Sequence, residues 1–335
     1  MNIRGARLKA TAAASDLHRK LNLRSEIREG LRPIDVYKAI IDLDVPLLFR
    51  PLEGVLGVYL SSPEKGILIS SSDALNPARQ RYTAAHELGH LCMGHGNSVD
   101  DAQNINNQES LQRAETAPTD VPIFEAEAEM FASEFLMPKA LIVSTCKKMG
   151  LNKAGIMDPK NVYQLALRLG TSYQATCYAL RSNELVSFQA LNRLTQFTPK
   201  QIKQECIDEG TSIEHPHSDV ILLDKTDHGR QLLLKPGDHV IMSLPEHTSG
   251  GFQWTVPDIS PLVHWLDDKR SGASPEGVFG SPVLRHLTFT GESKVDLLLT
   301  ECRSWGNREY INQFGINVDF RGREEGLPRV AREAL

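Results

Sequence analysis

The sequence predicts an α+β domain, a short helical segment and an all-β sandwich, in that order along the chain. Its 335 residues exceed one average domain, so two or three units are expected. Before residue 158, helical patterns surround a few short apolar runs, and the following segment is helical in pattern. After residue 198, strand-length apolar runs alternate with Gly, Pro, Asn and Asp. We therefore place the units at 1–157, 158–197 and 198–335.

Composition and charge are those of an ordinary globular protein. Hydrophobic residues make up 41% of the chain and charged residues 24%, which favours packed cores over long disorder. A net charge of -5 gives no reason to expect nucleic acid as the main partner. The sequence has neither an apolar run of membrane-spanning length nor the apolar core of a secretory signal, so we expect a cytoplasmic protein that binds no membrane. Five scattered cysteines without a C-x-x-C pair argue against a disulfide framework and a cysteine-rich zinc site.

Three short apolar runs predict the strands of the first domain. They are "VPLLFR", "VLGVYL" and "GILIS", at 45–50, 55–60 and 66–70, separated by Gly and Pro. A later segment, 96–120, is polar and almost without large apolar residues, so we expect a mobile surface loop there. Because this loop links the two segments that carry the candidate site residues, we expect it to lie near the cleft and act as a lid.

The stretch "RQRYTAAHELGHLCMGH" predicts a helix that carries a metal motif. Asn76 suits the N-cap of this helix and Gly94 its terminator. His86 and His90 are four residues apart and project from one face, so their imidazole nitrogens can converge on one tetrahedral ion. Glu87 is offset from that face and suits a base that acts on water. The motif predicts zinc-assisted hydrolysis, and surface histidines on an ordinary helix are the simpler alternative.

A catalytic zinc needs a third protein ligand, and the segment "PIFEAEAEMFASEFLMP" offers one. Glu125 and Glu129 share one stripe of this predicted helix with two alanines, which would allow close approach to another helix. Glu125 would bind the metal, and Glu129 would accept the other N–H of a ligating histidine. Glu127 falls off the stripe, and we expect it to be solvated. His95 is an alternative third ligand, but it follows the expected helix end and should point away from the other histidines.

These two segments resemble the ImmA/IrrE family of metallopeptidases. The family pattern is R-x-R-aromatic-T-x-A-H-E-x-G-H, followed by E-x-x-A-[ND]-x-F-A-x-x-[LF]-L-M-P, and this sequence reads "RQRYTAAHELGH" and "EAEAEMFASEFLMP". The resemblance implies a zincin-like domain with Zn2+ as cofactor, His86, His90 and Glu125 as its ligands, and Glu87 as the general base. Glu129 departs from the family, which more often has Asn or Asp at that position.

The segment 158–197 is similar to the helix-turn-helix region that follows the peptidase in this family. The similarity is carried by "VYQLALRLGTSYQATCYAL". Only four basic residues lie in this segment, which is too few for strong neutralisation of phosphates: Lys160, Arg168, Arg181 and Arg193. We therefore expect a packing role for these helices in preference to DNA contact.

The last part resembles the chagasin-type cysteine protease inhibitors. "LPEHTSGGFQW", "GVFGSPVLRHLTF" and "LLLTECRSW" are similar to the three signature loops of that family, which implies an immunoglobulin-like sandwich. The loops depart from the family, because "EHTSG" stands where Asn-Pro-Thr-Thr-Gly is usual and "RSW" where Arg-Pro-Trp is usual. We expect Trp254 in the core, and the candidate partner-binding residues are Thr248, Ser249, Gly250, Gly251, Arg303 and Trp305.

Three functions fit these observations. The favoured one is a zinc endopeptidase that cleaves a regulatory protein, for which the family resemblance implies a helix-turn-helix repressor, with the sandwich as a regulatory or partner-binding domain. The second is a non-catalytic binding module or protease inhibitor, whose partner at the C-terminal loops would be a papain-like cysteine protease or a sensor protein. The third is a DNA-binding regulator. Glu87 favours the first, because a scaffold has no use for a general base.

Overall fold

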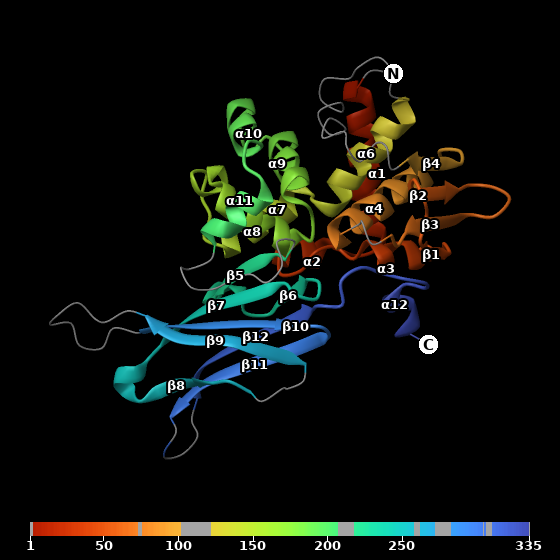
Figure 1. The fold of residues 1–335 in the computed structure, drawn as a ribbon. Helices are drawn as coiled ribbons and strands as arrows, with labels where there is room; N and C mark the ends of the chain where they lie inside the picture. The colour runs from red at the N-terminus through yellow and green to blue at the C-terminus, as the bar shows by residue number, and fades with distance from the viewer. Residues whose placement is uncertain are drawn as a thin grey trace.

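The computed structural model describes residues 3–72, 76–101, 122–206, 218–257, 262–271, 283–303, 305 and 310–334. Figure 1 shows a helix-rich N-terminal half and a β-rich C-terminal half that lie side by side. Residues 102–121, which include most of the expected lid, lie outside the described part of the chain.

A four-stranded sheet forms the base of the N-terminal half. Its strand order is β1-β3-β2-β4, with β1 parallel to β3 and β2 antiparallel to both of its neighbours. The strands are β1 (Leu47–Arg50), β2 (Val55–Leu60), β3 (Gly66–Ser70) and β4 (Ser98–Asp101). The three predicted strands are confirmed, but β4 lies inside the segment predicted to be a loop. Its short, polar sequence is tolerated because it is an edge strand.

In the described part of this half, α3 and α4 pack on the sheet and further helices pack against them or beside them. The helices are α1 (Ile3–Lys20), α2 (Arg24–Glu29), α3 (Val36–Ile41), α4 (Pro77–Met93), α6 (Ile123–Leu136) and α7 (Lys139–Lys148). Ala6, Ala10 and Ala14 form a small, buried stripe on α1, which packs along α6. The aromatic side chains of Phe131 and Phe135 stack in the core beneath it.

The predicted helical segment continues the same core. It contains α8 (Pro159–Leu169), α9 (Tyr173–Ser182) and α10 (Phe188–Leu194), and Gly170 ends α8 in a left-handed conformation at φ 64°. The buried faces of these helices join the apolar cluster of the N-terminal half. Arg168 is buried and pairs with Asp227, so it is not available to a phosphate.

The β-rich part begins later than residue 198. Residues Pro199–Glu205 form α11, and the Thr198 and Gln201 side chains close a capping box at its start. Ile202 of α11 belongs to the N-terminal core. The first strand of the C-terminal part starts at Val220.

Two four-stranded sheets share one apolar core in the C-terminal part, with strand orders β5-β7-β10-β9 and β6-β12-β11-β8. Trp254 is buried between them, as predicted, and its indole N–H donates to the Pro245 carbonyl. The sequence of β9, "VHWLDDKRS", is mostly exposed and contains four charged residues, so it lacks the apolar run that predicts a strand. The strands are β5 (Val220–Asp224), β6 (Arg230–Leu233), β7 (His239–Glu246), β8 (Phe252–Thr255), β9 (Val263–Ser271), β10 (Val283–Gly291), β11 (Lys294–Arg303) and β12 (Tyr310–Asp319).

The end of the chain returns to the N-terminal half. Phe49 of β1 pairs with Gly326 through two backbone hydrogen bonds, and α12 (Arg329–Arg332) lies beside α3 (Figure 1). The buried Gln80 side chain on α4 donates to the Glu324 carbonyl at 3.0 Å and accepts from the Glu324 N–H at 2.7 Å. The helix that carries the metal motif is therefore tied to the segment that follows β12.

No helix in the described ranges has the length and apolar character that a membrane crossing requires. The five cysteines are free thiols, in agreement with the prediction that they form no disulfide framework.

Candidate metal centre

Helices α4 and α6 position the candidate ligands. The Asn76 side chain caps α4 by accepting from the Arg79 N–H at 2.8 Å, and Gly94 ends the helix at φ 71°. The predicted helix and both of its end signals are thus confirmed. The two helices approach closely at Gly89, where an added Cβ would lie 3.1 Å from the Cα and carbonyl oxygen of Ala128.

Gly89→Ala is expected to push α6 away from α4. The new methyl would meet backbone atoms that cannot rotate aside, which should cost about 1–3 kcal/mol of unfolding free energy and weaken metal binding by displacing Glu125. Zinc titration and chemical denaturation measure the two effects. Gly66→Ala is the matched control, because its added Cβ meets only the Pro46 carbonyl oxygen, at 3.9 Å. Equal zinc affinity in both variants would contradict this account of the helix contact.

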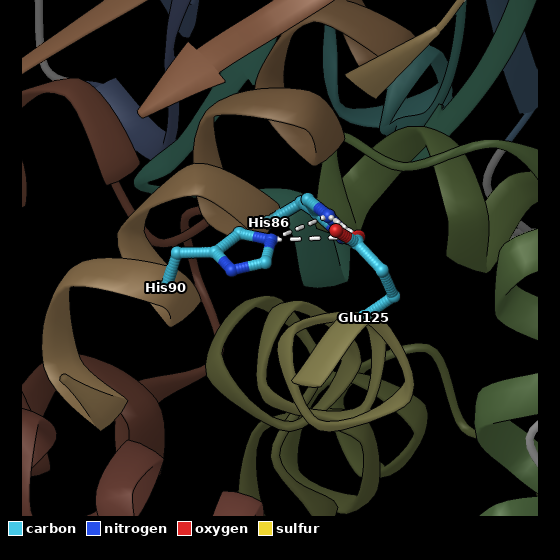
Figure 2. A group of neighbouring side chains, drawn as sticks. All are labelled: His86, His90 and Glu125. Atoms are coloured by element: carbon cyan, nitrogen blue, oxygen red, sulfur yellow. Dashed lines mark hydrogen bonds and ion pairs between the residues drawn. The ribbon is translucent and has the colours of Figure 1, made fainter. Parts of the chain in front are cut away.

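The structure brings His86, His90 and Glu125 together (Figure 2). The Nε2 atom of His86 lies 3.1 Å from the Nε2 atom of His90 and 3.1 Å from Oε2 of Glu125. The third side of this triangle, from His90 Nε2 to Glu125 Oε2, measures 3.5 Å. His90 is fully buried and His86 nearly so, whereas Glu125 is partly exposed. The site is therefore closed on the α4 side and open beside Glu125.

The donor atoms fit a tetrahedral zinc ion. Zinc bonds of about 2.0–2.1 Å at tetrahedral angles separate neighbouring ligand atoms by roughly 3.3 Å, and the three distances here bracket that value. Two imidazole nitrogens and one carboxylate oxygen are a donor set that catalytic zinc sites use. The residues present thus suit a metal ion with one position left open.

Glu129 lies behind His86, on the side away from the triangle. Its Oε2 is 3.4 Å from Nδ1 of His86, and its Oε1 accepts from the Tyr82 hydroxyl at 3.1 Å. Glu129 thus contacts the nitrogen of His86 that does not face the triangle.

The protonation of the candidate ligands follows from the same contacts. Burial would raise the pKa of Glu125, but its hydrogen bonds with His86 and His90 lower the pKa to about 2. Burial would lower the pKa of His86, but the contacts with Glu125 and Glu129 hold that pKa well above its usual range. Glu125 is therefore an ionised carboxylate, the form that binds a metal.

Glu87 occupies a buried pocket of its own between α4 and the sheet. Its side chain is fully buried, and its Oε2 accepts from the Ser98 hydroxyl at 3.4 Å. Its Oε1 is buried and has no hydrogen-bond partner among the described residues. Gly57 on β2 makes room for it, since a Cβ there would lie 2.6 Å from Oε1. Burial raises the pKa of Glu87 to about 8, so this carboxylate takes up a proton readily.

Two expectations about nearby residues were wrong. Glu127 is buried, not solvated, because α1 covers that face of α6 and Lys9 pairs with it at 2.8 Å. His95 does not point away, because the left-handed Gly94 turns the chain back and places its Nδ1 3.0 Å from Nδ1 of His90. The sequence did contain a signal for this reversal, because His95 directly follows Gly94, the glycine that ends the helix.

The candidate partner-binding residues of the C-terminal part lie at one end of the sheets. Thr248, Ser249 and Gly250 form a short 3-10 turn, and the Arg303 side chain donates to the Gly250 carbonyl at 3.0 Å. The Arg303 guanidinium also lies 4.4 Å from the centre of the Phe252 ring. Trp305 is 63% exposed and so close to Gly251 that an added Cβ would meet its ring at 2.5 Å. The structure brings these residues together, far along the chain from the metal ligands.

Comparison with known proteins identifies the N-terminal unit. Residues 42–181 match the M78 peptidase family model, described as the IrrE N-terminal-like domain. The chain is 28% identical over 137 residues to the radiation response metalloprotease IrrE of Deinococcus radiodurans, covering 41% of this chain and 36% of that protein. Over 172 residues it is 27% identical to the radiation response metalloprotease IrrE of Deinococcus deserti, covering 51% of this chain and 55% of that protein. The chain thus contains an IrrE N-terminal-like domain distantly related to these metalloproteases, and it spans less than two thirds of either relative.

The C-terminal sheets are similar to two solved structures. One is the cysteine protease inhibitor EhICP2 from Entamoeba histolytica, with a TM-score of 0.28 and 18% identity, covering 32% of this chain and all of that one. The other is amebosin, with a TM-score of 0.24 and 19% identity, covering 30% of this chain and 97% of that one.

Proposed function

We propose that this chain is a zinc-dependent endopeptidase that cleaves a regulatory protein at a specific site. The observation that carries the proposal is the triangle of His86, His90 and Glu125 beside the buried carboxylate of Glu87. The match to the IrrE N-terminal-like domain supports the reaction class. The substrate we propose is a helix-turn-helix transcriptional repressor, in a cytoplasmic setting.

Each side chain of the site has its own role in peptide hydrolysis. A zinc ion held by His86, His90 and Glu125 would supply Lewis-acid polarisation of the scissile carbonyl. Glu87 takes the proton of the attacking water at Oε1, which has no hydrogen-bond partner among the residues that the structure describes, and passes it to the leaving amine. Glu129 holds the imidazole of His86 in place.

Removal of any one ligand is expected to abolish both metal binding and cleavage. His86→Ala, His90→Ala and Glu125→Ala each leave two donors, too few to hold a catalytic zinc. Metal content after dialysis, measured by atomic absorption, checks this. Glu53→Ala, at an exposed position before β2, is the control and should keep one zinc per chain. Stoichiometric, tight zinc in the Glu125 variant would show that the third ligand lies elsewhere.

The substrate proposal is tested by co-incubation. The purified chain, with zinc and after chelation, is mixed with the helix-turn-helix repressor encoded nearest to its gene, and products are located by mass spectrometry. We expect one zinc-dependent cut in the repressor. If the repressor stayed intact while another cytoplasmic regulator was cleaved, the repressor would not be the substrate. A cut that persists after chelation would overturn the metal mechanism.

The C-terminal part is proposed to bind a partner or regulate the peptidase. Trp305 is a large exposed aromatic whose ring lies against Gly251, while Arg303 holds the neighbouring Gly250, and exposed aromatic and arginine side chains often act as interface anchors. A papain-like cysteine protease or a sensor protein is the partner proposed for these loops. Trp305→Ala should then weaken partner capture without changing zinc content.

A further inference from the structure

A line of polar contacts leads from the metal triangle to the N-terminal helix. Nδ1 of His90 lies 3.0 Å from Nδ1 of His95, and Nε2 of His95 lies 2.9 Å from Oε2 of Glu127. The same carboxylate oxygen lies 2.8 Å from the Lys9 ammonium on α1. His90, His95 and Glu127 are all buried to at least nine tenths, and Lys9 brings the line to the surface.

Only one assignment of donors and acceptors along this line is compatible with metal binding by His90. Glu127 is paired with a lysine and can only accept, so His95 must donate from Nε2. A neutral His95 then accepts at Nδ1, and His90 donates its Nδ1–H. That tautomer leaves the lone pair of His90 Nε2 directed into the triangle, where a ligand atom is needed.

The aromatic surroundings fix the same geometry. The ring of His90 stacks on Tyr59 at 6.4 Å between centroids, and Phe124 packs against both His90 and His95. Neither imidazole is free to turn its polar edge toward water. His86 has a carboxylate, Glu129, at its outer nitrogen, whereas His90 reaches a carboxylate only through a second histidine.

We propose that His95 is a positioning residue that, with Glu127 and Lys9, locks His90 in its metal-binding tautomer. The inference rests on the proposed metal site at His86, His90 and Glu125. It extends that site beyond the matched domain, because Lys9 lies before residue 42. Helix α1 is therefore part of the metal centre as well as of the core.

The experiment compares His95→Leu with His95→Asn in the full chain. Leucine removes the acceptor, whereas the Asn oxygen can replace Nδ1 of His95 as acceptor for His90. Zinc affinity, measured by competition with a chromophoric chelator, should fall about 10–100-fold in the leucine variant and stay near wild type in the asparagine variant. Lys9→Met should lower affinity by a smaller factor, and Lys20→Met on the same helix should leave it unchanged.

A second readout does not need metal. The 15N shifts of the His90 ring in the zinc-free chain should report a protonated Nδ1 in the wild type and in His95→Asn, and a mixture of tautomers in His95→Leu. Equal zinc affinity and an unchanged His90 tautomer in a folded His95→Leu protein would overturn this inference alone. Absence of zinc binding by the wild type would instead overturn the proposed function.

Discussion

Glu87→Gln is expected to stop peptide cleavage while zinc binding persists. Glutamine keeps the shape of the side chain and fills the same buried pocket, but it cannot carry a proton from water to the leaving amine. The loss in kcat/KM should be about 10²–10⁴-fold, the usual contribution of a general base. Cleavage of the repressor substrate and zinc content are measured on the same preparations.

Glu64→Gln is the matched control, because Glu64 is exposed in the turn between β2 and β3. It should cleave at the wild-type rate. If Glu87→Gln cleaved as fast as this control, the proton acceptor would have to be another group than Glu87.

Asp227→Ala is expected to destabilise the whole chain by about 3–5 kcal/mol. The Asp227 carboxylate accepts from Arg168 at 2.9 and 2.7 Å and also from Arg230, and all three side chains are buried. Its removal leaves two guanidinium groups without their counter-ion. Because Arg168 is on α8 and Arg230 on β6, the loss should lower the stability of both halves, which denaturant titration with a separate probe in each half would detect.

Asp16→Ala is the comparison for that effect. Asp16 pairs with Arg19 at the surface, where both side chains are more than half exposed, so the expected change is below about 1 kcal/mol. A similar small loss for Asp227→Ala would contradict the view that this buried cluster holds the halves together.

The cluster of Asp227, Arg168 and Arg230 should also make the unfolding free energy of the chain fall at acidic pH. Burial alone would raise the pKa of Asp227, but Arg168 and Arg230 hold that pKa below its usual range. A carboxyl whose pKa is lower in the folded state stabilises the fold at higher pH and loses this contribution as pH falls below about 4. The unfolding free energy of the wild type should therefore fall more steeply on acidification than that of Asp227→Ala.

Local signals in the sequence were sufficient for much of the fold. Asn76 and Gly94 bound α4 because an N-cap and a left-handed terminator depend on neighbouring residues alone. His86 and His90 share a face of α4 for the same local reason, and Glu125 could be chosen because its helix carries the acidic and alanine stripe.

The remaining features depend on contacts between distant segments. Glu127 was expected in solvent because the sequence of its own helix does not indicate that α1 covers it. The position of His95 was not predicted, because it depends on the direction in which the chain leaves Gly94. The exposed strand β9 lacks the apolar alternation that marks a half-buried strand. Gln80 gave no signal at all, since its partner is 244 residues further along the chain.

That pairing also sets an order of events during synthesis. While the ribosome is still making the C-terminal strands, the buried amide of Gln80 has no Glu324 to bind, and β1 lacks its bridge to Gly326. Domains usually complete their folding from the N-terminus as they emerge, but here two contacts of the first domain are made by residues that follow β12. A chain stalled before residue 324 would carry every candidate metal ligand and the proposed base, yet it would lack the contacts that finish α4. The contacts that complete the metal-bearing helix thus form only after the strands of the C-terminal part have been synthesised.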